Sequence, residues 1–143
     1  MWRWLLPLVA LSLAGCSEKG LRLPQSPLLA GLERKSGLIA YIGPDGNVYT
    51  INQGGGNQTM ITEDAHPREE GLQRFYDFPT WSAADNKLAF VGFEVAEDGL
   101  TAAGIFTADP DEQSPVEIYN SEQHVPFYLY WSPDGEWVSF LSL

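Results

Sequence analysis

The sequence predicts an all-β fold of short antiparallel strands, and three observations lead to this expectation. Two segments share a Trp-Ser pair, a turn with Asp and a following strand pattern, and their tryptophans, Trp81 and Trp131, lie fifty positions apart. The chain contains 14 Gly and 10 Pro, which favours short strands joined by turns. The segments around these turns alternate apolar and polar residues, the pattern of half-buried strands. We therefore expect recurring β-hairpins and no long helix.

The first hairpin is predicted in residues 38–62. Strands at 38–42 and 47–53 flank the turn Gly43-Pro-Asp-Gly-Asn, and Gly54-Gly-Gly-Asn then leads into a strand at 59–62. In such turns proline fixes φ, aspartate bonds nearby backbone amides, and glycine accepts a positive φ without a steric penalty.

The second copy predicts strands at 78–82, 87–93, 103–108 and 116–120, and the third predicts strands at 127–132 and 136–143. We expect Trp81 and Trp131 to supply buried area between neighbouring sheets. We interpret the aspartates Asp45, Asp85 and Asp134 as turn residues. The alternative is calcium binding, which needs six or more oxygen ligands, and the sequence has no clustered Asp-x-Asp series.

The recurring hairpins, and above all Trp131-Ser-Pro-Asp-Gly, resemble the TolB-like β-propeller repeat family, whose repeats are WD-repeat-like. The resemblance covers residues 37–143 and implies antiparallel four-stranded blades: 37–62 is blade 1 without its innermost strand, 78–120 is blade 2, and 127–143 is the start of blade 3. The second copy departs from the motif at Ala83, Ala84 and Asn86.

These segments amount to about two and a half blades, whereas propellers close with about four to eight. We therefore expect the sequence to be an amino-terminal fragment of a longer protein. The alternative is that several copies associate into a closed ring.

The first residues predict export and a lipid anchor. Arg3 precedes an apolar run from Trp4 to Leu13, and Leu13-Ala-Gly leads to Cys16, the only cysteine. The run is shorter than the roughly 20 residues of a membrane-spanning helix. Residues 1–15 resemble a bacterial lipoprotein signal peptide, which implies lipidation of Cys16 and a membrane-anchored protein that faces the periplasm or the outside. The alternative is an ordinary secretory signal with a leftover cysteine.

Residues 16–36 are predicted to be a spacer, in which Ser26 and Pro27 are able to start a short helix that ends before Gly37. The formal net charge of the chain is −11. A negative surface repels phosphates, so we expect no nucleic acid partner and expect membrane attachment through the lipid on Cys16 alone.

Long connections are predicted at 63–77, 94–101 and 121–126, and alternate connections of an antiparallel meander lie on the same side. Binding residues are often found in such loops. The polar and aromatic candidates there form one set for a peptide or glycan ligand: His66, Arg68, Arg74, Tyr76 and His124. We interpret Tyr76 itself, with Phe78, Phe127 and Tyr128, as core residues beside the innermost strands.

The sequence contains no nucleophile elbow, no His-Glu-x-x-His and no phosphate-binding Gly-rich loop. We expect no cofactor, no metal site and no catalysis. The expected function is a lipid-anchored platform for a protein or peptide partner at the cell envelope. The alternative is the amino-terminal propeller of a serine peptidase of the prolyl-oligopeptidase type whose catalytic domain is missing.

Overall fold

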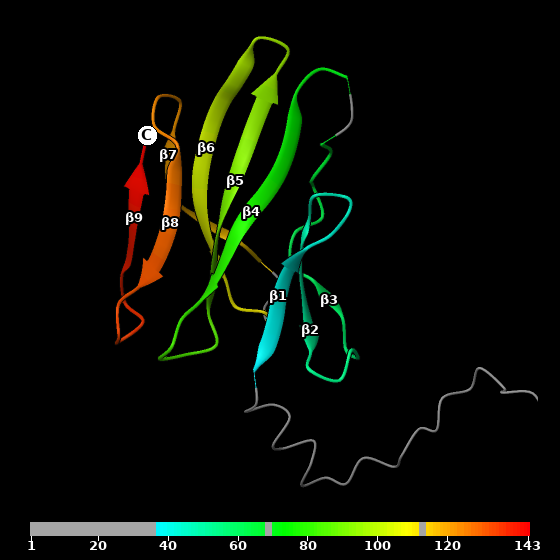
Figure 1. Cartoon of the computed structure of the whole chain (residues 1–143), viewed down its shortest axis with the longest axis vertical. Helices are drawn as coiled ribbons and strands as arrows, with labels where there is room; N and C mark the ends of the chain where they lie inside the picture. Colours follow the sequence, from blue (N-terminus) through cyan, green and yellow to red (C-terminus); the bar gives the residue numbers. More distant parts are fainter. Residues whose placement is uncertain (1–36, 68–69, 112–113) are drawn as a thin grey trace, which may run out of the picture.

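A computed structural model describes residues 37–67, 70–111 and 114–143. In these ranges the chain forms strands and no helix, arranged as antiparallel sheets of three, four and two strands (Figure 1). The predicted all-β class is therefore confirmed. The signal segment, Cys16, the spacer and its short helix lie outside the described residues.

The first sheet has the order β1-β2-β3, with β1 at Leu38–Ile42, β2 at Val48–Asn52 and β3 at Thr59–Met60. Its first turn depends on Asp45, whose carboxylate accepts hydrogen bonds from the backbone N of Asn47 at 3.2 Å and the hydroxyl of Tyr49 at 2.7 Å. Gly46 has a φ of +83°, a conformation that glycine adopts without strain. The interpretation of Asp45 as a turn residue is confirmed.

The second sheet has the order β4-β5-β6-β7, with β4 at Gln73–Trp81, β5 at Leu88–Ala96, β6 at Gly99–Ala108 and β7 at Val116–Ser121. The prediction of a long loop at 94–101 is wrong, and the loop predicted at 63–77 ends earlier, because β4 begins at Gln73. Only Glu97 and Asp98 separate β5 from β6, and the Thr101 hydroxyl donates to the Glu94 carbonyl oxygen at 3.0 Å. The polar residues of this segment, which suggest a loop in the sequence, lie inside the β5-β6 hairpin and form hydrogen bonds there.

The third sheet pairs β8 at Pro126–Trp131 with β9 at Val138–Ser142. In the turn between them the carboxylate of Asp134 accepts hydrogen bonds from the Ser132 hydroxyl and from the backbone N of Glu136, and Gly135 has a φ of +75°. Both turns therefore combine an aspartate that accepts hydrogen bonds with a glycine at positive φ, as the sequence predicted.

The three sheets stack face to face, with β5 in the middle. Leu88 and Phe90 of β5 join Val48, Ile61 and Tyr76 in one apolar cluster between the first and second sheets. The alternate residues of β5 face the other way and pack with Ile105 and Leu129 in a second cluster, between the second and third sheets. Successive side chains of a strand point to opposite faces, so β5 contributes to both clusters.

The two repeated tryptophans lie at these sheet interfaces. Trp81 packs against the first cluster and Trp131 against the second, although each remains partly exposed. The indole Nε1 of Trp131 also donates to the carbonyl oxygen of Thr80 at 3.0 Å and so joins β8 to β4. The prediction that these residues pack between sheets is confirmed.

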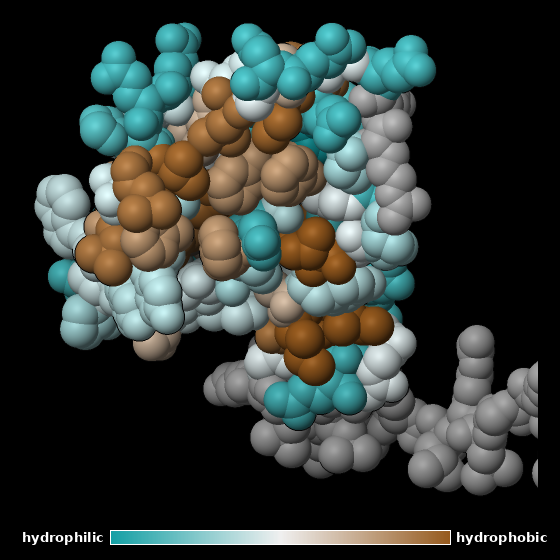
Figure 2. Space-filling view, turned by 45° about the horizontal axis from the view of Figure 1, so that its top comes forward, coloured by the Kyte–Doolittle hydropathy of each residue, from teal (hydrophilic) through white to brown (hydrophobic). Residues whose placement is uncertain are grey.

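Several large apolar side chains are exposed, and Figure 2 shows hydrophobic residues spread across the face below a hydrophilic upper rim. Tyr76 is buried as expected, with 4% of its surface exposed. The interpretation of Phe78 and Tyr128 as core residues is wrong, because 44% and 61% of their surfaces are exposed. Bulges in β4 and β8 at these positions turn both rings outward.

Candidate functional site

A polar cluster lies where the connection after β3 meets the face of β4. Arg74 and Tyr76 are two residues apart on β4 and therefore share one face of the sheet. Glu94 lies directly opposite Arg74 on β5, and Asp64 approaches from the connection. These side chains, with His66 beside them, form what we call the Asp64 cluster: Asp64, His66, Arg74, Tyr76 and Glu94.

The connection that carries Asp64 is held against β2 by a buried hydrogen-bond network. The Thr62 hydroxyl accepts from the backbone N of Val48 at 2.9 Å and donates to Asn47 Oδ1 at 3.0 Å. The same Oδ1 accepts from the backbone N of Ala65 at 3.1 Å. Since Asn47 and Thr62 are both 4% exposed, this network fixes the backbone on either side of Asp64.

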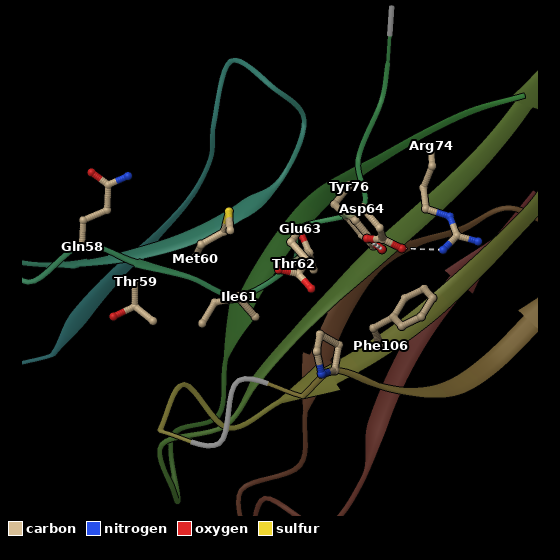
Figure 3. A pocket seen from close by; sticks show the side chains of 11 residues that line it. Gln58, Thr59, Met60, Ile61, Thr62, Glu63, Asp64, Arg74, Tyr76 and Phe106 are labelled. Atoms are coloured by element: carbon tan, nitrogen blue, oxygen red, sulfur yellow. Dashed lines mark hydrogen bonds and ion pairs between the residues drawn. The ribbon is translucent and has the colours of Figure 1, made fainter. Parts of the chain in front are cut away.

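Within the cluster, Asp64 is the central acceptor. Its Oδ2 lies 2.6 Å from Arg74 Nη1, and its Oδ1 accepts from the Tyr76 hydroxyl at 2.7 Å (Figure 3). The other guanidinium nitrogen of Arg74 donates to Glu94 Oε1. Arg74 thus joins two carboxylates from different elements.

These contacts set the charge state of the cluster. Burial raises the pKa of the Asp64 carboxyl, but the hydrogen bonds from Tyr76 and Arg74 outweigh burial, and the pKa lies below its ordinary value. Burial and the hydrogen bond to Asp64 raise the pKa of the Tyr76 phenol. Hydrogen bonds to Glu94 and Asp64 raise the pKa of the Arg74 guanidinium. At neutral pH the cluster therefore holds an ionised Asp64, a neutral Tyr76 and a charged Arg74.

His66 contributes backbone and ring contacts. Its backbone N donates to the Arg74 carbonyl oxygen at 2.7 Å, and its Nδ1 lies 2.7 Å from the carbonyl oxygen of Asp64. Because a carbonyl oxygen only accepts, Nδ1 carries the hydrogen. His66 therefore holds the connection next to β4.

Two glycines make room for the aromatic rings beside the cluster. The ring of Tyr76 lies edge-on to Phe90 and Phe106, with centroid distances of 5.4 and 5.8 Å. A Cβ on Gly92 would lie 2.7 Å from the Phe106 ring, and a Cβ on Gly104 would lie 3.2 Å from it. Glycine at these two positions, which pair across β5 and β6, allows the rings to lie close to the backbone.

An open groove of about 640 Å³ runs between the two sheets at this cluster. One wall is the segment 58–64, and the other comprises Arg74, Tyr76, Phe106 and Pro115 (Figure 3). A smaller hollow of about 90 Å³ continues over Gly92 and Gly104 and shares Arg74, Tyr76 and Phe106 with the groove. We call the larger space the inter-sheet groove.

The structure brings together three of the predicted site residues, His66, Arg74 and Tyr76. Arg68 lies outside the described residues. His124 lies in the connection between β7 and β8, where its backbone N donates to the Ser121 hydroxyl at 3.0 Å, and it does not line the inter-sheet groove. His124 therefore belongs to a different part of the surface.

The sequence does not indicate Asp64, Glu94 or Phe106 as candidate site residues. Glu94 lies in the loop predicted at 94–101, although the strand pattern of Leu88–Ala96 continues through it. Phe106 lies in the strand predicted at 103–108, for which the sequence indicates no functional role. The available signal was the two-residue spacing of Arg74 and Tyr76, which predicts a shared face and hence partners on the neighbouring strand.

The polar groups beside the inter-sheet groove are largely paired with one another. Asp64, Glu94 and Arg74 satisfy one another, and the Thr62 hydroxyl is engaged with backbone and amide groups. Within the described residues, no three His, Cys, Asp or Glu side chains are grouped as a metal site, and no helix has the length and hydrophobicity to cross a membrane.

Comparison with known proteins adds no relative: no family model, curated protein or solved structure matches this chain.

Proposed function

We propose that the chain is part of a TolB-like β-propeller, anchored at the cell envelope by a lipid on Cys16, and that it acts as a non-enzymatic platform for peptides or exposed protein segments. The inter-sheet groove is the proposed binding site. The observation that carries the proposal is the prearranged lining of this groove. Asp64 of one wall is bonded to Arg74 and Tyr76 of the other, and Arg74 is also paired with Glu94.

The stacking of the sheets supports the propeller. The second sheet is a four-stranded meander, and the hairpins β1-β2 and β8-β9 repeat parts of it on either side. Apolar clusters join the first sheet to the second and the second to the third. Neighbouring blades of a propeller pack in this manner, face against face.

The chemistry of the groove supports a peptide ligand. Its wall at 58–64 includes β3, an edge strand that pairs with β2 on one side in the described part of the chain. An extended peptide is able to add to such an edge through backbone hydrogen bonds. Met60 and Phe106 offer apolar surface for its side chains, and Glu63 offers an acceptor.

Retention of peptides from an equimolar pool of random heptapeptides on immobilised protein tests the proposal. Met60 lines the groove and is 43% exposed, so Met60→Arg places a bulky charge in the site without disturbing the core. Leu72, outside the groove and 49% exposed, provides the matched control Leu72→Arg. We expect the parent and Leu72→Arg to retain the same peptides and Met60→Arg to lose them. Equal retention by Met60→Arg, or no retention by the parent, rejects the groove as the site.

A further inference from the structure

Strands β4 and β8 share an unusual backbone feature. Phe78 and Tyr128 lie fifty positions apart, at equivalent places in the repeat, and have φ values of +56° and +53°. L-residues with bulky side chains disfavour this conformation. Each residue lies in a bulge, between Asp77 and Thr80 in β4 and between Phe127 and Tyr130 in β8. A strained conformation repeated at equivalent positions points to a role for the two side chains.

The bulges place aromatic rings around one hollow on the surface. This hollow, about 660 Å³, is lined by Phe78, Pro79 and Thr80 of β4 and by Phe127–Tyr130 of β8, and we call it the aromatic shelf. Tyr128 and Tyr130 are each 61% exposed, and their ring planes are within 14° of parallel. The lining contains no Asp, Glu, Lys, Arg or His, although the chain as a whole has a net charge of −11.

Exposed aromatic rings with hydroxyl donors and no charges are the surface that a polyproline II peptide recognises. Proline rings pack on the aromatic faces, and the free carbonyl groups of the peptide accept hydrogen bonds from tyrosine hydroxyls. A glycan also stacks on aromatic rings, but it needs several polar side chains around its hydroxyl groups, and the shelf offers Thr80 and two tyrosines.

We propose that the aromatic shelf binds the segment 21–27 of the same chain, Leu-Arg-Leu-Pro-Gln-Ser-Pro, which lies outside the described residues. Pro24 and Pro27 form a Pro-x-x-Pro motif. Each proline has a fixed φ, and the residues before them, Leu23 and Ser26, are biased toward the extended region. Because proline restricts the backbone in every state of a chain, such a motif loses little conformational entropy on binding.

The charge of the segment and the length of chain that joins it to β1 are compatible with binding to the aromatic shelf. Arg22 precedes the motif, and Asp77, which is exposed, lies next to Phe78 at the border of the shelf. The chain between Pro27 and Leu38 extends to at most about 36 Å. Stacked sheets lie about 10 Å apart, and β1 contacts β4, which contacts β8. Figure 1 shows β1 beginning at the lower end of the molecule, where β4 and β8 end. The segment is thus long enough to return to the shelf.

Limited trypsin digestion of the full chain tests the contact, with first cuts identified by mass spectrometry. The segment contains one trypsin site, at Arg22, and the neighbouring sites at Arg34 and Lys35 lie outside the contact and serve as the internal reference. Cleavage of a docked segment follows the population of its open state. We expect the ratio of cutting at Arg22 to cutting at the reference sites to rise roughly tenfold when the contact is removed.

Two variants remove the contact from opposite sides. Tyr128→Asn with Tyr130→Ser removes the rings, and asparagine tolerates the positive φ at position 128. Pro24→Ala with Pro27→Ala removes the motif. Trp137→Ser, at a residue that is 71% exposed and outside the shelf, is the matched control and leaves the ratio unchanged. Far-ultraviolet circular dichroism verifies that each variant retains its sheets.

An unchanged ratio in both double variants overturns the proposal. Digestion at several protein concentrations distinguishes a contact within one chain from a contact between two copies. A contact within one chain gives the same ratio at all concentrations, whereas a ratio that changes on dilution assigns the shelf to a second copy and rejects the intrachain contact. The shelf shares no residue with the inter-sheet groove, so this outcome is independent of the proposed function.

Discussion

At the scale of single residues, the packing of Gly92 against two aromatic rings is the most sensitive point of the site. A Cβ there would lie 2.7 Å from the Phe106 ring and 3.0 Å from the Tyr76 ring. We predict that Gly92→Ala lowers the free energy of unfolding by about 1–3 kcal/mol, the range for overpacked interiors. Urea denaturation measures the loss.

Gly54 provides the control for this prediction. The nearest neighbour of a Cβ on Gly54 would be the side-chain oxygen of Asn52 at 3.4 Å, an ordinary contact. Gly54→Ala is expected to change the free energy of unfolding by less than about 0.5 kcal/mol. A similar loss in both variants would show that the close approach at Gly92 does not determine stability.

The ionisation of Asp64 makes the stability of the folded protein depend on pH in the acid range. Its pKa in the folded protein lies below the ordinary value of about 3.9. A carboxyl with a lowered pKa contributes stability that is present above the unfolded-state pKa and is lost as the pH falls through the folded-state pKa. Since the side chain is 48% exposed, we expect this contribution to be about 1 kcal/mol or less.

The matching experiment compares the parent with Asp64→Asn by urea denaturation at pH 6 and pH 2.5. Asparagine keeps an acceptor for the Tyr76 hydroxyl and removes the charge that faces Arg74. The parent should be the more stable protein at pH 6, and the difference should shrink at pH 2.5. A difference that is independent of pH would mean that ionisation of Asp64 contributes nothing.

Residues of the site could be predicted from the sequence only where their signal was local. The sequence predicts His66, Arg74 and Tyr76 as polar and aromatic residues of one connection at 63–77, whereas Arg74 and Tyr76 lie in β4. Glu94 is twenty positions from Arg74, and its role depends on the pairing of β4 with β5. The exposure of Phe78 and Tyr128 depends on bulges that no local pattern indicates.

At the scale of elements, the hydrogen bond from Trp131 to Thr80 joins two sheets. The Nε1 to carbonyl oxygen distance is 3.0 Å, and the indole also packs against the second apolar cluster. Trp131→Phe keeps most of the ring and removes the donor, so we predict a loss of about 1 kcal/mol in the free energy of unfolding.

Trp137→Phe is the control for that measurement. Trp137 belongs to the same repeat, and 71% of its surface is exposed. Its substitution is expected to change stability by less than about 0.5 kcal/mol. If thermal or urea denaturation gives equal losses in the free energy of unfolding for the two variants, the hydrogen bond to Thr80 does not stabilise the packing of the two sheets.

The hairpin turns were predictable because their determinants are close in sequence. Asp45 and Asp134 bond residues within four positions, and Gly46 and Gly135 have the positive φ that the turns require. The lengths of β4, β5 and β6 were not predictable in this way. They depend on partners on other strands, such as Glu94 for Arg74, which convert apparently polar loop residues into paired strand residues.

At the scale of the whole molecule, the proposed lipid anchor places the domain at a membrane. Metabolic labelling with a tagged fatty acid, in a bacterial host, should label the parent, and Cys16→Ala should remain unlabelled because it lacks the thiol that accepts the acyl group. Equal labelling of the two proteins would reject the anchor. Peptide binding in the inter-sheet groove would then remain a proposal for a protein that is not attached to a membrane.

The inter-sheet groove depends on the packing of the first sheet against the second, and the fold as a whole depends on the stacking of three sheets with β5 in the middle. Hydrogen exchange of backbone amides tests it most directly. Leu88, Phe90 and Val91 are fully buried between the neighbouring sheets, whereas Leu141 of β9 is 58% exposed. We predict that amides of β5 exchange only through global unfolding and that amides of β9 exchange much faster. Equal exchange in β5 and β9 would mean that the hairpins do not pack together, and it would contradict this stacking.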